Sequence, residues 1–144
     1  MAVSDVGVRG SCLCGRVGYE ITGNLGIFQY CHCSRCRKFT GSAHASNLFV
    51  SAGQFRWLRG EAFVTRYEPD DAKYFATSFC KKCGSSLPWA AKIGSTTIVP
   101  AGTLDGDPGI RPGQNIFCAS QATWYVSAGE LKRYDGLPTK PASR

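Results

Sequence analysis

The stretch Tyr30-Cys31-His32-Cys33-Ser34-Arg35-Cys36-Arg37-Lys38 decides how the rest of this chain is organised. It places three cysteines within six residues and surrounds them with basic side chains. Thiolates at such short spacing are typical of a single metal site, and soft sulfur ligands favour zinc over the hard cations. A structural zinc ion normally takes four protein ligands, so this stretch alone supplies one ligand too few.

Two further cysteine pairs provide a second ligand set. The segments Cys12-Leu13-Cys14-Gly15 and Cys80-Lys81-Lys82-Cys83-Gly84 both end in Cys-Gly, where glycine allows a tight turn that directs backbone amides toward a sulfur. We therefore predict two zinc ions per chain. The structural ion is assigned to Cys12, Cys14, Cys80 and Cys83. The other is assigned to Cys31, Cys33 and Cys36, which leave the fourth position open for catalysis by a Lewis acid.

A competing grouping of the cysteines remains open. It assigns Cys12, Cys14, Cys31 and Cys33 to one ion, and Cys36, Cys80, Cys83 and Cys118 to the other. Against it, Cys118 stands alone in an apolar run, where a small core residue is the more common role. His32 lies between two ligands and is expected to point away from the metal. His32 and His44 are both candidates for structural histidines or for proton carriers.

Length and composition predict one soluble domain. A chain of 144 residues, 43% of them hydrophobic, can bury a sizeable core, and no apolar run is long enough to span a membrane. The first residues carry no secretory signal pattern, so we expect a cytoplasmic protein. In that reducing compartment eight cysteines indicate metal binding rather than disulfides. Residues 8–138 are expected to be structured, with a frayed C-terminal tail.

Short alternating runs predict an all-β fold with very little helix, arranged as a zinc-bearing antiparallel β meander. One short helix is expected over residues 34–40, with Ser34 as its N-cap and Gly41 as its stop. Residues 106–113, rich in glycine and proline, are expected to form a surface loop. The strand candidates are residues 16–21, 27–30, 45–50, 55–58, 63–67, 74–79, 86–91, 96–99 and 116–120.

The cysteine pattern resembles the glutathione-dependent formaldehyde-activating (GFA) family, which includes centromere protein V. The resemblance rests on Gly10-Ser11-Cys12-Leu13-Cys14-Gly15, on the stretch quoted above together with Gly41, and on Phe79-Cys80-Lys81-Lys82-Cys83-Gly84-Ser85. Similar segments at Trp57-Leu58-Arg59-Gly60, Ala101-Gly102-Thr103-Leu104-Asp105 and Ala122-Thr123-Trp124-Tyr125 extend it over about residues 8–138. The resemblance implies a β-tent fold and the same two sets of zinc ligands.

The resemblance also implies a reaction, the condensation of formaldehyde with glutathione to S-(hydroxymethyl)glutathione, which is classed with the carbon–sulfur lyases. Arg35, Arg37 and Lys38 are then candidates for binding the carboxylates of glutathione, or for offsetting the thiolate charge. One position departs from the pattern. Where relatives often carry a histidine before the Ile-Phe strand, this chain has Asn115, so we expect no histidine-dependent proton transfer at that point.

A non-catalytic zinc-binding module for nucleic acid or a protein partner is the alternative. The formal net charge of +7 would suit such a partner. Zinc-bound thiolates reduce that charge, however, and the aromatic residues mostly occupy alternating strand positions that are typical of a core. The sequence therefore favours a zinc-dependent enzyme acting on a small thiol such as glutathione and an aldehyde, with no membrane partner.

Overall fold

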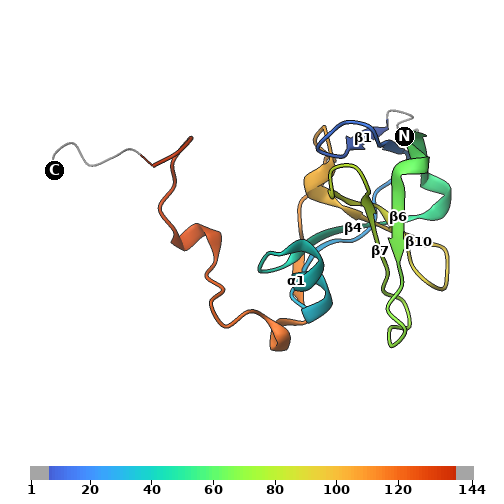
Figure 1. The fold of residues 1–144 in the computed structure, drawn as a ribbon. Helices are drawn as coiled ribbons and strands as arrows, with labels where there is room; N and C mark the ends of the chain where they lie inside the picture. The colour runs from blue at the N-terminus through green and yellow to red at the C-terminus, as the bar shows by residue number, and fades with distance from the viewer. Residues whose placement is uncertain (1–6, 139–144) are drawn as a thin grey trace.

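A computed structural model describes residues 7–138, and within them the chain forms eleven β-strands and one α-helix (Figure 1). This content confirms the predicted all-β class. Positions 1–6 and 139–144, which include most of the predicted frayed tail, lie outside the described residues. The elements are β1 (Val8–Ser11), β2 (Gly18–Ile21), β3 (Phe28–Cys31), α1 (Ser34–Thr40), β4 (Ala45–Ser51), β5 (Phe55–Arg59), β6 (Val64–Tyr67), β7 (Thr77–Cys80), β8 (Ser86–Leu87), β9 (Trp89–Ala90), β10 (Thr96–Pro100) and β11 (Gln114–Ile116).

The strands form three sheets. The largest has the order β11-β3-β4-β10-β9, and the two smaller sheets have the orders β1-β2-β5 and β6-β7-β8. Figure 1 shows β6 and β7 running across the direction of β4. In the largest sheet β3 and β4 are consecutive in the chain, as are β9 and β10, but β4 pairs with β10, and β11 pairs with β3 in parallel. The connectivity is therefore more complex than the predicted antiparallel meander.

The main core lies between the largest sheet and the sheet that contains β2. Its fully buried side chains come from β2, β4 and β10, at the alternating positions that face inward from each strand. Tyr19 is fully buried there, and its hydroxyl lies 2.6 Å from the hydroxyl of Thr103, so the ring packs in the core while its polar end is satisfied. The cluster consists of Tyr19, Ile21, Leu48, Val50 and Val99.

Two residues separate the end of β3 from the start of helix α1. Its N-cap is Cys33, whose sulfur accepts a hydrogen bond from the amide of Cys36, so the prediction of Ser34 as the cap was wrong by one residue. A sulfur that caps the helix is held in a fixed direction, which matters for the metal centre described below. Gly41 ends the helix as predicted, in the left-handed conformation with φ 66°, and its amide donates to the carbonyl of Arg37.

The prediction for residues 116–120 was also wrong. β11 ends at Ile116, and the next residue, Phe117, has φ 55° and turns the chain into a short 3-10 helix, Cys118–Ser120. The strand alternation stops at this turn, so Cys118 does not pack in the core but is exposed. The predicted surface loop at residues 106–113 contains no strand, and an ion pair between Arg111 and Asp107 closes it.

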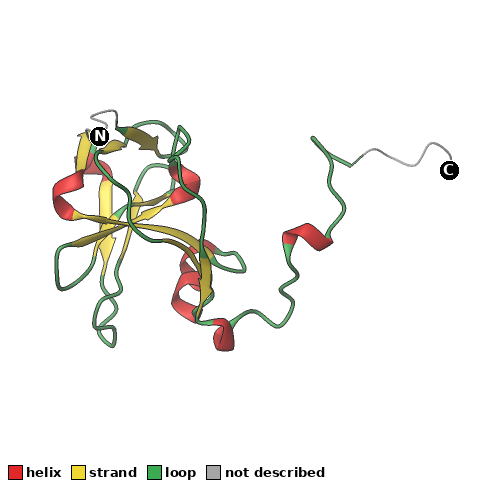
Figure 2. Cartoon of the chain, turned by 180° about the vertical axis from the view of Figure 1, so that it is seen from behind, coloured by secondary structure: helices red, strands yellow, loops and turns green. Residues whose placement is uncertain are grey.

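Residues 121–138 extend away from the sheets (Figure 2). The segment is attached at its start, where Ala122 is buried and Tyr125 packs its ring 5.0 Å from that of His32. Further along, large apolar side chains such as Leu131 and Leu137 are exposed. Among the described residues, no helix combines the length and the hydropathy needed to cross a bilayer.

Candidate metal centres

Four cysteine sulfurs meet where the turn after β1 approaches the turn after β7. The sulfurs of Cys12, Cys14, Cys80 and Cys83 all lie within 4.8 Å of one another. Cys12 and Cys80 are buried, and they pack with Val17 and Leu87 in an apolar cluster. Four sulfurs gathered in this way are a donor set that can hold one metal ion. The centre joins two parts of the chain that lie far apart in the sequence.

Matching turns bring these sulfurs together. Gly15 and Gly84, which follow Cys14 and Cys83, have φ of 80° and 79°, a conformation that glycine adopts without strain. We expected the amides of such turns to donate to sulfur. The two glycine amides donate to the carbonyls of Cys12 and Cys80, whereas amides just beyond the glycines donate to sulfur, that of Val17 to Cys12 at 3.3 Å and that of Ser85 to Cys83.

Ser85 binds both halves of the four-cysteine centre. Its hydroxyl accepts a hydrogen bond from the amide of Leu13 and lies 3.3 Å from the Cys83 sulfur. The hydroxyl and then the amide of Ser85 lower the pKa of Cys83 to about 5. A thiol with a low pKa is readily available as the thiolate that a metal ion binds. The sequence alone gives Ser85 no role in the centre.

The second group joins the end of β3 to the first turn of α1. The sulfurs of Cys31, Cys33 and Cys36 lie within 4.8 Å of one another, and Cys31 and Cys36 are buried. In the part of the chain that the structure describes, no further Cys, His, Asp or Glu ligand atom belongs to this group. The competing grouping is not the one that the structure assembles, since Cys36 lies with Cys31 and Cys33, and Cys118 belongs to neither group.

The thiols of the three-cysteine group cannot easily ionise together. Hydrogen bonds from the thiols of Cys31 and Cys36 lower the pKa of Cys33 to about 2, and the Cys36 amide, 3.3 Å from the Cys33 sulfur, adds to this effect. Contacts with Cys31 and Cys33, followed by burial, raise the pKa of Cys36 above its usual range. A bound cation would offset the repulsion between the thiolates, so the donor set fits a metal ion.

Asn47 contributes to this centre from the neighbouring strand β4. Its side chain is buried, and its amide nitrogen lies 3.9 Å from the Cys36 sulfur. Donors of this kind orient metal ligands and reduce their charge. The sequence offers no signal for it, because Asn47 reaches the cysteines only through the pairing of β3 with β4.

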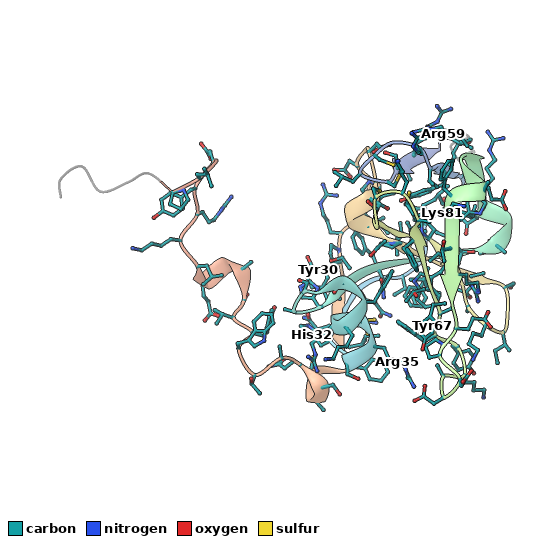
Figure 3. All side chains as sticks on the ribbon, in the orientation of Figure 1. Tyr30, His32, Arg35, Arg59, Tyr67 and Lys81 are labelled. Atoms are coloured by element: carbon teal, nitrogen blue, oxygen red, sulfur yellow. The ribbon has the colours of Figure 1, made fainter. Side chains whose placement is uncertain are left out.

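His32 turns away from the three sulfurs and is buried beneath the chain that follows β11. Its Nε2 lies 2.9 Å from Oδ1 of Asn115, which stands on the parallel neighbour of β3. The ring of His44 lies 5.1 Å away, stacked in turn on Tyr30 at 4.2 Å. Figure 3 shows Tyr30 and His32 beside α1, on the side where the C-terminal segment leaves the sheets. Both histidines therefore sit in one aromatic cluster rather than among the sulfur ligands.

The three-cysteine group opens onto a cavity of about 590 Å³. Cys31, Cys33 and Cys36 belong to its lining, and most of the remaining wall consists of aromatic and aliphatic side chains. This cavity could not be predicted from the sequence, because its walls come from residues spread between Asn47 and Phe117. The arrangement gives a small molecule access to the sulfurs from one side.

The three cations predicted to bind the substrate, Arg35, Arg37 and Lys38, do not all line the same space. Arg35 lines the cavity and lies 3.4 Å from Oδ1 of Asp71. Arg35 and Lys38 also line a neighbouring hollow of about 380 Å³, and Figure 3 shows Arg35 near Tyr67, which belongs to the same hollow. Arg37 lines neither of these two spaces; it is half-buried, and its Nε has no hydrogen-bond partner among the described residues.

Comparison with known proteins places this geometry in a family. A search of curated proteins finds no match. The fold is similar to the crystal structure of a Rhodobacter sphaeroides protein from a structural genomics programme, with 25% sequence identity, a TM-score of 0.53, and coverage of 72% of this chain and 97% of that chain. A family model described as glutathione-dependent formaldehyde-activating enzyme matches residues 7–120, which include both cysteine groups and exclude the segment at 122–125 that the sequence analysis had added. The chain belongs to the glutathione-dependent formaldehyde-activating family.

Proposed function

We propose that this chain is a zinc-dependent enzyme of the carbon–sulfur lyase type, which adds the thiol of glutathione to formaldehyde and yields S-(hydroxymethyl)glutathione. The observation that carries the proposal is the group of three thiols at the wall of an open cavity. The family supplies the reaction class. We also propose the cytoplasm as the compartment, since glutathione keeps thiols reduced there.

Both cysteine groups have the donor chemistry of zinc sites. In this proposal Cys12, Cys14, Cys80 and Cys83 hold a structural ion, and Cys31, Cys33 and Cys36 hold a catalytic one. A zinc ion with three protein ligands supplies an open coordination position, where it can lower the pKa of a thiol or polarise a carbonyl oxygen. The donor hydrogen bonds from the amide of Cys36 and from Asn47 prepare the sulfurs for that ion.

Two cationic side chains, Arg35 and Lys38, favour a thiol that carries carboxylates. Arg35 stands at the edge of the cavity, and its contact with Asp71 is exposed enough to be weak, so a substrate carboxylate can replace it. Lys38 lies one helical turn further on the same side, in the adjoining hollow. We assign Arg35 and Lys38 to the carboxylates of glutathione. We assign Arg37, which does not line these spaces, to offsetting the charge of the thiolates.

Addition itself requires little of the protein beyond positioning. The carbon–sulfur bond forms, the carbonyl double bond becomes single, and the thiol proton ends on the new hydroxyl oxygen. Asn115 holds Nε2 of the buried His32, so this pair fixes the aromatic cluster behind β3, and we assign it no proton transfer with the substrate. The protein then accelerates the reaction by holding the deprotonated thiol close to the aldehyde and in the right orientation.

Arg35→Ala is expected to weaken the binding of glutathione about five- to tenfold while leaving a neutral thiol such as 2-mercaptoethanol unchanged. The reason is the loss of a cation at the cavity edge, and the difference between the two thiols should shrink as salt rises. Titration calorimetry on the zinc-loaded protein measures both affinities. Arg111→Ala is the matched control, because Arg111 also pairs with an exposed aspartate but lies in the loop at residues 106–113. Equal weakening of both thiols would contradict the assignment.

The function is tested by adding formaldehyde and glutathione to zinc-loaded protein and following the adduct by NMR. We expect adduct formation clearly above the uncatalysed background. A rate equal to background, with both metal centres filled, would contradict the enzyme and favour the binding-module alternative.

A further inference from the structure

The cavity beside the three thiols is far larger than formaldehyde needs. Its volume is about 590 Å³, whereas formaldehyde has two non-hydrogen atoms and a water molecule occupies about 30 Å³ of liquid. The volume falls within the range of pockets that hold much larger ligands. A site built only for formaldehyde would leave most of this space unused.

The buried walls of the cavity are mostly apolar, whereas its two cationic side chains, Arg35 and Lys73, are exposed. Trp89 and Ile98 belong to a buried apolar cluster, Phe75 packs on it with its ring 5.2 Å from that of Trp89, and Phe49 completes this wall. Ile93, at the rim, is 49% exposed. Walls of this kind cannot satisfy the amides and carboxylates of a peptide, and burying those groups without partners is costly. The buried part of the cavity is therefore unsuited to the polar body of glutathione.

The charged part of the substrate has a separate place. The adjoining hollow of about 380 Å³ contains Arg35 and Lys38, and Arg35 and Phe75 line both spaces. The peptide carboxylates of glutathione match the cations of the second hollow, and only its thiol needs to reach the three cysteines. The apolar cavity is then left for the other reactant.

We infer that the aldehyde partner carries an apolar group, aromatic or branched, that binds in the cavity of about 590 Å³. The inference rests on the proposed function, since it names the second substrate of the same site. For an aldehyde RCHO, the glutathione sulfur bonds to the carbonyl carbon, the carbonyl double bond becomes single, and the thiol proton moves to the oxygen. The product is the hemithioacetal RCH(OH)SG, and no oxidant or reductant is required.

Two stable thioethers test the inference without turnover. S-benzylglutathione carries an aromatic ring next to the sulfur, and S-methylglutathione carries the small group that corresponds to formaldehyde. Titration calorimetry on the zinc-loaded protein should show S-benzylglutathione binding at least about tenfold more tightly, the discrimination that an apolar pocket gives for several added carbons. Equal affinities would overturn the inference.

Neighbouring alanines provide a matched pair of variants. Ala91 lines the cavity, whereas Ala90 is exposed and does not line it. Ala91→Phe should fill the space and abolish the preference for S-benzylglutathione, while Ala90→Phe should retain it. Ile93→Asp places a charge at the exposed rim, where folding tolerates it, and should reduce the preference at least about fivefold even if Ala91→Phe does not fold. A preference that survives both Ala91→Phe and Ile93→Asp would also overturn the inference.

The formaldehyde assay keeps the two proposals apart. Adduct formation with formaldehyde, combined with equal affinities for the two thioethers, would leave the proposed function intact and remove the inference. A strong preference for S-benzylglutathione without any adduct formation would support the apolar pocket and contradict the proposed reaction.

Discussion

Cys83→Ser is expected to lower the melting temperature by more than about 10 °C, because the loss of a structural metal costs upwards of about 4 kcal/mol. Cys83 belongs to the centre that ties the turn after β1 to the turn after β7. Cys12→Ser takes a ligand from the other half of the same centre and should have the same effect. Thermal unfolding followed by circular dichroism measures both variants.

Cys36→Ser is the control for the structural prediction. Cys36 belongs to a centre formed within one stretch, by the end of β3 and the first turn of α1, so that centre holds together little of the chain. Its variant should unfold within a few degrees of the wild type. If Cys36→Ser unfolds as early as Cys83→Ser, the assignment of the structural and catalytic centres is wrong.

The same Cys36→Ser variant is expected to lose adduct formation by more than about a hundredfold. Replacing a residue that only hydrogen-bonds to a metal ligand already costs up to about a hundredfold in activity, and replacing a ligand itself should cost more. The loss follows from removing one of three ligands in a group that has no fourth cysteine, histidine or carboxylate ligand among the described residues. The assay is the NMR measurement of the glutathione adduct with zinc-loaded protein.

Cys118→Ser is the matched control for activity. Cys118 is exposed and belongs to neither sulfur group, so replacing its sulfur should change neither the rate nor the melting temperature. Full activity of Cys36→Ser, or an equal loss in Cys118→Ser, would contradict a catalytic role for the three-cysteine centre.

The parts of the structure that could be predicted from sequence are those that short spacings determine. Three cysteines within six residues place their sulfurs close together, and the two Cys-Gly pairs mark matching turns. The helix over residues 34–40 and its stop at Gly41 follow from local chemistry. Most strand positions follow from the alternation of apolar residues.

The parts that were missed depend on contacts between distant segments. β1 has no apolar alternation, and it is a strand because it pairs with β2. β11 is shorter than its apolar run predicts, because the turn at Phe117 ends it and exposes Cys118. The cavity and the donor Asn47 arise only when β3, β4 and the segment around Trp89 come together.

The most direct test of the central claim is a stepwise chelation in which released zinc, adduct formation and circular dichroism are followed together. We predict two zinc ions per chain at saturation. The first to leave should be the one held by Cys31, Cys33 and Cys36, and its release should abolish adduct formation while the circular dichroism spectrum stays unchanged. The second should leave only as the chain unfolds. Release of both ions together with loss of the fold, or a single ion per chain at saturating zinc, would contradict a structural centre beside a catalytic one.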